Sequence, residues 1–553
     1  GKTECTKQCL SFLAEVAGSE SNVEQKILNA NPVLEAFGNA KTLRNNNSSR
    51  FGRWMEVSFD ARGGICGCKI ENYLLEKARV VRQTSGERNY HIFYQLCTSK
   101  KWGQLYGVTR PADFRYLSES GCETVTGIDD EADFNDVTLA LTQLGFAEDE
   151  IDQMFGITAA VLYIGNIKFK SDGGEGSKLD DSSFEVQNVD NASTLLGCDA
   201  KRLALAFCER NIEVRGEKNR ILNKPEEARE ACDSFAKAVY NNLFDWIVKK
   251  INQCVQGQKG LFIGILDIFG FEIFKQNNFE QLCINFTNEK LQQHFNTNTF
   301  KEEENVYVSE GIEFDKVPFI DNQPVLDLIE KKPFGLLVLL DEEVRLPKGS
   351  DSKWHDKCDK NHENHECWLS DKNAKMRMEA ANFTVRHYAG DVEYNSNGFY
   401  DKNKDALFRD LYDLMSESSM NLSRQCFPPK DKNPRKLTSI SGQFRMQLNQ
   451  LMQVVNTCQP RYIRCVKPND AKRPNNFEMV MSIEQLTYAG VFEAVKIRKS
   501  GFPFRLLHRS FAARYRCLAK GRATFGHVRE GDDRSLCVEI MKCLPQDFSR
   551  VRI

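Results

Sequence analysis

The sequence predicts an α/β fold, in which helices cover a buried sheet, and two patterns carry that prediction. Leu261–Phe269 is an apolar run, typical of a strand buried on both faces inside such a sheet, and it ends in Asp267-Ile268-Phe269-Gly270. Shortly after it, apolar residues recur at helical spacing, at Phe279, Leu282, Cys283 and Phe286. A long amphipathic helix is therefore expected to leave the end of this strand and to be mechanically joined to it.

The same periodicities predict further elements. Met55–Asp60 and Ile65–Ile70, joined by a Gly63-Gly64 turn, predict a β-hairpin. A second helix is predicted by the spacing of Phe444, Leu448, Leu451, Met452 and Val455. Tyr462–Val466 is predicted to be a further strand. Three segments rich in Gly, Ser, Pro or charged residues predict exposed loops: Ser171–Ser183, Lys348–Trp368 and Pro428–Lys436.

Composition excludes several classes of protein. The 553 residues include 75 Lys or Arg and 77 Asp or Glu, a net charge of −2, so no global basic field attracts nucleic acid or a membrane surface. A hydrophobic fraction of 41% with 27% charged residues is typical of globular proteins, and the length favours several subdomains. The 19 cysteines are scattered singly, which is typical of reduced thiols in the cytosol. Neither a signal peptide nor a membrane-spanning stretch is expected.

The chain opens on Gly1-Lys2-Thr3, which matches the last three residues of a G-x-x-x-x-G-K-[ST] phosphate loop. In such a loop backbone N–H groups surround the phosphates, the lysine neutralises the β- and γ-oxygens, and the hydroxyl binds Mg²⁺. Because position 1 is not methionine, the chain is expected to begin inside this motif. Taken alone, a tripeptide recurs by chance, and a charged N-terminus is the simpler interpretation.

Two further strings contain the residue types that a nucleotide switch needs. Residues 45–53 read Asn-Asn-Asn-Ser-Ser-Arg-Phe-Gly-Arg, which places hydroxyls for Mg²⁺ and water beside a fixed cation; a solvated turn is the alternative. Residues 267–272 read Asp-Ile-Phe-Gly-Phe-Glu, in which the Asp suits a Mg²⁺ shell and the Gly N–H suits a γ-phosphate. Glu272 is a suitable ion-pair partner for Arg50, although a strand end followed by a helix acid is the alternative.

In this order and context the strings resemble those of the myosin motor domain. The resemblance covers essentially the whole chain through NPVLEAFGNAKT at 31–42, YLLEK at 73–77, GERNYHIFY at 86–94, LLDEE at 339–343, HYAG at 387–390, YIRCVKPN at 462–469 and GFP at 501–503. It implies a P-loop NTPase motor with a central mixed sheet flanked by helices, split by an actin-binding cleft, plus a small converter subdomain. It also implies four parts. Residues 1–260 form the nucleotide-binding and upper-cleft part, and residues 261–441 contain the second switch, the relay helix and the lower-cleft part. Residues 442–499 contain the actin-proximal helix, a sheet strand and the thiol-helix region, and residues 500–553 form an incomplete converter.

The resemblance implies an actin-based motor that couples Mg²⁺-dependent ATP hydrolysis to F-actin binding in the cytoplasm and actin cytoskeleton. Light chains or calmodulin-like proteins are expected beyond the C-terminal end. The implied catalytic residues are Ser48, Arg50, Gly270 and Glu272. The implied nucleotide-binding residues are Gly1, Lys2, Thr3, Asn45, Ser48, Ser49, Asp267 and Gly270. Mg²⁺ is expected at Thr3 and Ser49, and at Asp267 through water. Closure of the Arg50–Glu272 pair is expected to exclude water. Residues 1–553 alone are expected to bind nucleotide weakly, because most of the phosphate loop would precede them.

An actin-binding surface is implied as well, over residues 442–465, a helix-loop-helix at 348–367 and a basic loop at 428–436. The expected contact residues are Glu217, Lys430, Lys432, Arg435, Lys436, Gln447, Leu448, Leu451, Met452 and Pro460. Glu217 lies sixteen residues before Asp233, at a position that is acidic or phosphorylatable in the family.

Several alternatives stay open. A kinesin-like motor shares the switch logic, but Phe51-Gly52 and Phe269-Gly270-Phe271 differ from its motifs. An actin tether without turnover is opposed by the intact switch residues. The residues His355, Cys358, His362, His365 and Cys367 resemble a metal cluster, yet their spacing fits no zinc pattern, and a solvated actin-facing surface is favoured. One departure from the family concerns its reactive thiols, since Thr487 and Arg498 stand where cysteines are common.

Overall fold

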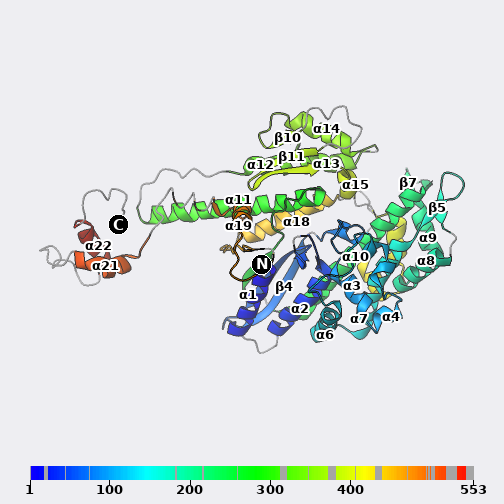
Figure 1. Cartoon of the computed structure of the whole chain (residues 1–553), viewed down its shortest axis with the longest axis horizontal. Coiled ribbons are helices and arrows are strands. Elements are labelled where there is room, and N and C mark those ends of the chain that lie inside the picture. Colours follow the sequence, from blue (N-terminus) through cyan, green and yellow to red (C-terminus); the bar gives the residue numbers. More distant parts are fainter. Residues whose placement is uncertain are drawn as a thin grey trace. The chain divides into compact units, whose positions relative to one another are not determined.

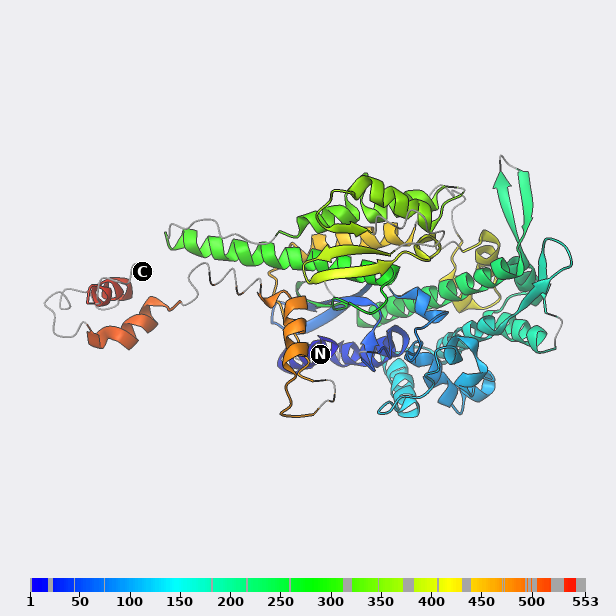
Figure 2. The same cartoon turned by 45° about the horizontal axis from the view of Figure 1, so that its top comes forward.

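The computed structural model describes residues 2–17, 23–43, 45–73, 75–180, 183–214, 217–257, 260–311, 321–346, 348–370, 382–404, 407–429, 439–469, 471, 473–492, 495, 499, 505–518 and 532–543. Within these ranges, the side chains of residues 183–185, 212–214, 217, 218, 300, 302, 303 and 488 are excepted. The chain divides into two compact units: residues 1–288, 325–387 and 391–467 form the first, and residues 289–324, 388–390 and 468–553 form the second. The helix α11 (Phe279–Ser309), long and green in Figure 2, passes from the first unit into the second.

The first unit is built around a three-stranded sheet in the order β4-β3-β9. Its strands are β3 (Gly52–Phe59), β4 (Ile65–Tyr73) and β9 (Leu261–Asp267), and both pairings are antiparallel. Because side chains alternate across a strand, Met55 and Val57 of β3 share one face with Cys68 and Ile70 of β4, and all four are buried. The helices α2 (Val23–Gly38) and α10 (Pro225–Val255) pack on β4 (Figure 1).

The opposite face of the sheet is more polar. Glu56, Glu71 and Phe262 project from it and line an open pocket of about 570 Å³ together with Gln450 and Val454 of the helix α18 (Ile440–Val455). The sheet is thus covered on both faces, which agrees with the α/β layering that the sequence predicts.

The remaining elements of the first unit lie mostly in two stretches. Between β4 and β9 the remaining α-helices are α3 (His91–Thr98), α4 (Trp102–Leu105), α5 (Arg115–Ser118), α6 (Asp130–Leu144), α7 (Glu148–Asn166), α8 (Ser183–Leu196) and α9 (Ala200–Cys208). After α11 come α12 (Gln323–Glu330), α13 (Leu336–Val344), α14 (Asp351–His362), α15 (Phe399–Lys404), α16 (Arg409–Ser416) and α17 (Asn421–Cys426). The small sheets are β5 (Phe169–Ser171) with β6 (Ser177–Leu179), β7 (Glu209–Val214) with β8 (Glu217–Leu222), and β10 (Trp368–Ser370), β11 (Asn382–His387) and β12 (Gly390–Asn395).

In the second unit, α19 (Met479–Tyr488), α21 (His508–Tyr515) and α22 (Asp533–Met541) are short. The last two pack together, and Cys537 Sγ donates a hydrogen bond to the His508 carbonyl at 3.2 Å.

The hairpin, the long helix after β9 and the helix at 444–455 are confirmed as β3–β4, α11 and α18. The three described strands of the central sheet pair antiparallel, and the mixed sheet stays a prediction. Four other predictions are wrong. The first residues of β9 are exposed, with Leu261 at 87%, so this strand is not buried throughout. Ser171–Ser183 contains the β5–β6 hairpin instead of only a loop.

The third wrong prediction is the strand at Tyr462–Val466, which has no regular secondary structure. A strand exists only as part of a hydrogen-bonded ladder, and none of the sheets in the described part of the chain includes this segment. Ile463 is accordingly 61% exposed. The fourth wrong prediction is the exposed loop at Lys348–Trp368, because this segment contains the helix α14. There Trp354, Cys358 and His362 recur four residues apart and are buried.

Candidate nucleotide site

Two hydroxyls from distant parts of the chain meet at the start of α1 (Lys2–Ala17). Thr3 lies in its first turn, and Ser49 lies on β2 (Ser48–Ser49), which pairs with β1 (Asn39–Ala40) directly after α2. The Oγ atoms of Thr3 and Ser49 are 3.3 Å apart. Two of the three residues that the sequence predicts at the Mg²⁺ site are therefore brought together.

Lys2 lies over Gly270. A Cβ atom placed on Gly270 would be only 2.6 Å from Lys2 Nζ, so the ammonium occupies space that only a glycine leaves free. Burial lowers the pKa of Lys2, while the carboxylates of Asp267 and Glu272 act in the opposite direction. Lys2, Asp267 and Gly270 are thus neighbours, as predicted.

The guanidinium of Arg50 bridges two carboxylates. Its Nη1 is 3.2 Å from Glu272 Oε1, and its Nε is 2.6 Å from Glu76 Oε2. The Arg50 side chain is only 2% exposed. Burial by itself disfavours its charge, but Glu76 and Glu272 outweigh that effect and raise the pKa of Arg50. The predicted Arg50–Glu272 pair is present, and Arg50 also donates to Ser48 Oγ at 3.2 Å.

Glu76 is a member of this network that the sequence analysis missed. Its carboxylate also accepts from Arg79 Nε at 2.7 Å, and Arg79 continues to Glu87 at 2.9 Å. Burial alone would raise the pKa of Glu76, but Arg50 and Arg79 lower it to about 2. No local spacing points to Glu76, because it lies 26 residues from Arg50 and is brought in by the fold.

Asp267 has a second missed neighbour, the buried Arg53. Arg53 Nη2 lies 3.9 Å from Asp267 Oδ2, across the β3–β9 ladder in which the two residues are directly paired. Arg53 Nη1 donates to Asn31 Oδ1 at 2.7 Å. Arg53 therefore connects the end of β9, at Asp267, to Asn31 of α2. Arg53 stands in the 45–53 string, so its presence near the site could have been expected from the sequence.

A side chain of α11 clamps the backbone of Glu272. Asn285 Oδ1 accepts from the Glu272 N–H and Asn285 Nδ2 donates to the Glu272 carbonyl, both at 2.8 Å. Asn285 also donates to the Tyr394 hydroxyl at 2.9 Å. The expected mechanical joint between the strand end and the helix therefore has a specific side chain, one helical turn or more inside α11.

The other predicted nucleotide contacts are placed less tightly. Asn45 is exposed, and its side chain closes a small turn with the backbone of Asn47, donating to the carbonyl at 2.8 Å and accepting from the N–H at 3.1 Å. Gly1 lies outside the described residues.

The site's donor set fits a magnesium ion. Two hydroxyls and a carboxylate are hard oxygen donors, which Mg²⁺ prefers together with water and substrate phosphates. Thr3, Ser49 and Asp267 are the residues that would hold it, with the ammonium of Lys2 beside them.

The structure separates the residues expected to contact actin into three groups. Leu448 and Leu451 are 3% and 1% exposed, so the surface role expected for them is corrected: both belong to the core under α18. Gln447, Met452 and Pro460 are partly exposed. The side chain of Glu217 and the residues Lys430, Lys432, Arg435 and Lys436 lie outside the described part of the chain.

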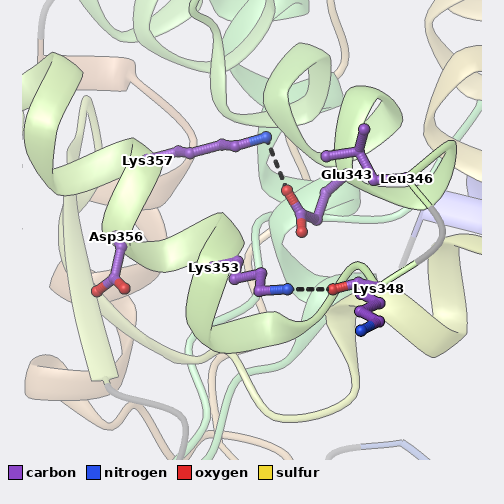
Figure 3. A pocket seen from close by; sticks show the side chains of 6 residues that line it. All are labelled: Glu343, Leu346, Lys348, Lys353, Asp356 and Lys357. Carbon is purple, nitrogen blue, oxygen red and sulfur yellow. Dashed lines mark hydrogen bonds and ion pairs between the residues drawn. The ribbon is translucent and has the colours of Figure 1, made fainter.

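The helix-loop-helix segment holds a charged pocket of about 560 Å³ at the start of α14 (Figure 3). Lys357 Nζ lies 2.8 Å from the buried Glu343 carboxylate, and Lys353 donates to the Lys348 carbonyl. The side chains of Lys353 and Lys357 are therefore already engaged by groups of the chain itself, and none of the nucleotide-site residues lines this pocket.

The histidines and cysteines of that segment do not form a metal site. Among the described residues no group of three or more His, Cys, Asp or Glu side chains is arranged to hold a metal ion. His355 is buried against the rings of Trp354, Trp368 and Phe383, and burial lowers its pKa. His362 donates from Nε2 to the Phe334 carbonyl at 2.8 Å. The solvated surface favoured from the sequence is equally wrong for His355, His362 and Cys358, which are buried.

Comparison with known proteins shows the family to which the chain belongs. The family model described as myosin head (motor domain) matches residues 1–553, and the chain belongs to that family. The chain is 47% identical over 574 residues to the high molecular weight form of myosin-1 of Acanthamoeba castellanii, covering 100% of the chain and 35% of that protein. It is 43% identical over 559 residues to the myosin-I heavy chain of Dictyostelium discoideum, covering 98% of the chain and 23% of the relative. The chain thus spans about a third or less of the length of these curated relatives.

No helix in the described ranges combines the length and apolar character that a membrane span requires.

Proposed function

We propose that this chain is the ATP-hydrolysing part of an actin-based motor, with Mg²⁺ as the cofactor of the reaction. The observation that carries the proposal is the Arg50–Glu272 ion pair of 3.2 Å beside the Thr3 and Ser49 hydroxyls. An ion pair that joins two switch segments across a phosphate site is what a gated phosphoryl-transfer site needs. Membership of the myosin head family supports actin as the track and the actin cytoskeleton of the cytoplasm as the location.

Each residue has a separate task in this proposal. Lys2 neutralises the β- and γ-phosphate oxygens, Asn45 and Ser48 contact the nucleotide, and Thr3, Ser49 and Asp267 hold Mg²⁺, the last through water. The metal ion, when bound, neutralises charge that develops on the transferred phosphoryl group. The Arg50–Glu272 pair closes the site against bulk water, and the Gly270 N–H faces the γ-phosphate, so that fixed dipoles stabilise the transition state.

The movement that closes the site would pass to α11 first through Asn285. Because this side chain holds both backbone polar groups of Glu272, a shift of Glu272 toward Arg50 displaces α11 with it. We expect α11 to carry the movement toward residues 500–553, the predicted converter, and light chains or calmodulin-like proteins to bind beyond them. These steps stay predictions.

The test is a set of charge reversals in the full-length protein. Arg50→Glu or Glu272→Arg alone should abolish the rapid phosphate burst, because removing one partner of a buried pair costs about 3–5 kcal/mol. The double reversal should recover part of the burst. Recovery should stay partial because residue 50 then faces Glu76, whose carboxylate lies 2.6 Å from Arg50 in the native chain. Adding Glu76→Gln to the double reversal should therefore recover more.

Two outcomes would remove the proposal. If the double reversal is no better than the worse single variant, with and without Glu76→Gln, the pair is not a gate. If steady-state phosphate release by the unmodified protein is stimulated by microtubules and not by F-actin, the actin-motor function is wrong.

A further inference from the structure

Two cysteines that lie 460 positions apart in the sequence meet beside the nucleotide site. Cys5 Sγ, in the first turn of α1, is 3.5 Å from Cys465 Sγ, in the segment 461–467, which has no regular secondary structure. Both residues belong to the first unit, and both are free thiols of intermediate exposure. By contrast Cys68, Cys97, Cys232, Cys283, Cys358, Cys367, Cys426 and Cys537 are buried. A small oxidant therefore has better access to this pair than to those eight thiols.

We propose that Cys5 and Cys465 form a reversible disulfide that switches off the nucleotide site when a peroxide is present. In the first step one thiol reacts with hydrogen peroxide to give a sulfenic acid and one water molecule. In the second step the other thiol attacks the sulfenic sulfur, the S–S bond forms, and the hydroxyl leaves as a second water molecule. Two thiols are oxidised by two electrons and one peroxide is reduced. A dithiol reverses the reaction by thiol–disulfide exchange.

The bond would disturb the site because its two anchors flank Lys2. Cys5 follows Thr3 by two residues, and Arg464 and Cys465 lie close enough to Lys2 to contribute to its electrostatic surroundings. A disulfide holds its sulfur atoms at about 2.05 Å, so the sulfurs must approach by roughly 1.5 Å from the observed 3.5 Å. We expect the first turn of α1 or residues 461–467 to shift as the two sulfur atoms approach. A misplacement of about 1 Å near reacting groups can lower a rate by about 100-fold.

The experiment treats the full-length protein with hydrogen peroxide and follows two readouts. Peptide mapping without reductant should give a cross-linked peptide pair containing Cys5 and Cys465, and dithiothreitol should remove it. ATP turnover should fall at least about ten-fold on oxidation, since a misplacement of about 1 Å is sufficient for such a loss. Turnover should return with dithiothreitol. This second readout rests on the proposed function, whereas the mapping does not.

Matched variants identify the responsible thiol. Cys5→Ser should keep its turnover through the same oxidation, each variant being compared with its own reduced state. Cys9→Ser should lose turnover as the unmodified protein does, because Cys9 lies one turn further along α1 and has the same intermediate exposure.

The results distinguish a failure of the disulfide switch from a failure of the proposed ATP hydrolysis. The switch is overturned if no cross-linked peptide forms in the unmodified chain, if the peptide forms without loss of turnover, or if Cys5→Ser is inhibited as strongly as the unmodified protein. A reduced protein that forms the cross-link but never hydrolyses ATP would instead contradict the proposed function, and the disulfide itself would stand.

Discussion

Gly270 shows at the scale of one residue how closely the strand end approaches the lysine of the phosphate-loop motif. Gly270→Ala places a Cβ atom 2.6 Å from Lys2 Nζ, which has to move. Because that atom is the free end of a flexible side chain, the free energy of unfolding should change by less than about 1 kcal/mol, the usual range for a tolerated substitution. Phosphate release should fall at least about ten-fold, since the ammonium is displaced from the phosphate site. Urea unfolding and phosphate release measure the two effects.

The matched control for this substitution is Gly127→Ala, where a Cβ atom meets nothing within 4 Å, although the backbone φ of +86° adds strain there. The control should lose stability and keep its turnover. Equal turnover in both variants would contradict the role given to the Gly270–Lys2 approach.

His91 makes stability depend on pH. Its Nε2 lies 3.2 Å from Asn47 Oδ1, and burial, together with Arg88, lowers its pKa to about 3 from the ordinary value of 6.5. Between those values the unfolded chain binds a proton that the folded chain does not, so this stabilisation is full above pH 6.5 and is lost as the pH falls. From pH 7 to pH 5 the contribution should drop by about 2 kcal/mol.

The measurement is urea unfolding of the native chain and of His91→Gln at both pH values. The native chain should lose about 2 kcal/mol more than the variant, because glutamine does not titrate. Other buried histidines titrate equally in both proteins and cancel in the difference. Parallel pH dependence in the two proteins would show that His91 is charged or exposed in the folded state.

At the scale of one element, the helix α18 has a buried face and an outer face, and the neighbouring residues Leu448 and Gln447 lie on different faces. Leu448→Ala should destabilise the protein by about 2–5 kcal/mol, because it removes a fully packed side chain from the core. Gln447→Ala, its neighbour, should change stability by less than about 0.5 kcal/mol, as surface substitutions do. F-actin cosedimentation at a temperature where both variants are folded should show weaker binding for Gln447→Ala alone. The opposite pattern would place the actin contact on the buried face.

At the scale of the whole molecule, the net charge of −2 gives the chain no general basic field that would attract a partner. We therefore expect the local basic segment 428–436 to speed the association of the chain with F-actin by electrostatic attraction. Neutralising Lys430, Lys432, Arg435 and Lys436 should lower the association rate with F-actin at low salt more than it raises the dissociation rate. A control with Lys69, Lys100, Lys201 and Lys249 changed to Gln removes the same charge from exposed positions elsewhere. Stopped-flow association across a salt series compares them, and equal slopes would remove the steering role.

The sequence by itself determined the features that depend on short-range pattern. Alternation and a Gly-Gly turn are enough to specify the β3–β4 hairpin, and apolar spacing is enough for α11 and α18, because these periodicities follow from local backbone geometry. Motif order was also enough to predict that one group of residues shares a site, because motif residues keep a fixed order around a phosphate. These residues are Lys2, Thr3, Ser49, Arg50, Asp267, Gly270 and Glu272.

Only the tertiary structure decided which partners these residues have. Four contacts join segments that are distant in the sequence: Glu76 with Arg50, Arg53 with Asp267, Asn285 with the Glu272 backbone, and Cys465 with Cys5. It also decided that Trp354 and Cys358 turn inward within a charged segment, and that residues 462–466 do not form a strand among the described residues. The physical reason is the same in each case: burial and hydrogen-bond pairing depend on what the rest of the chain brings alongside, and no local pattern contains that information.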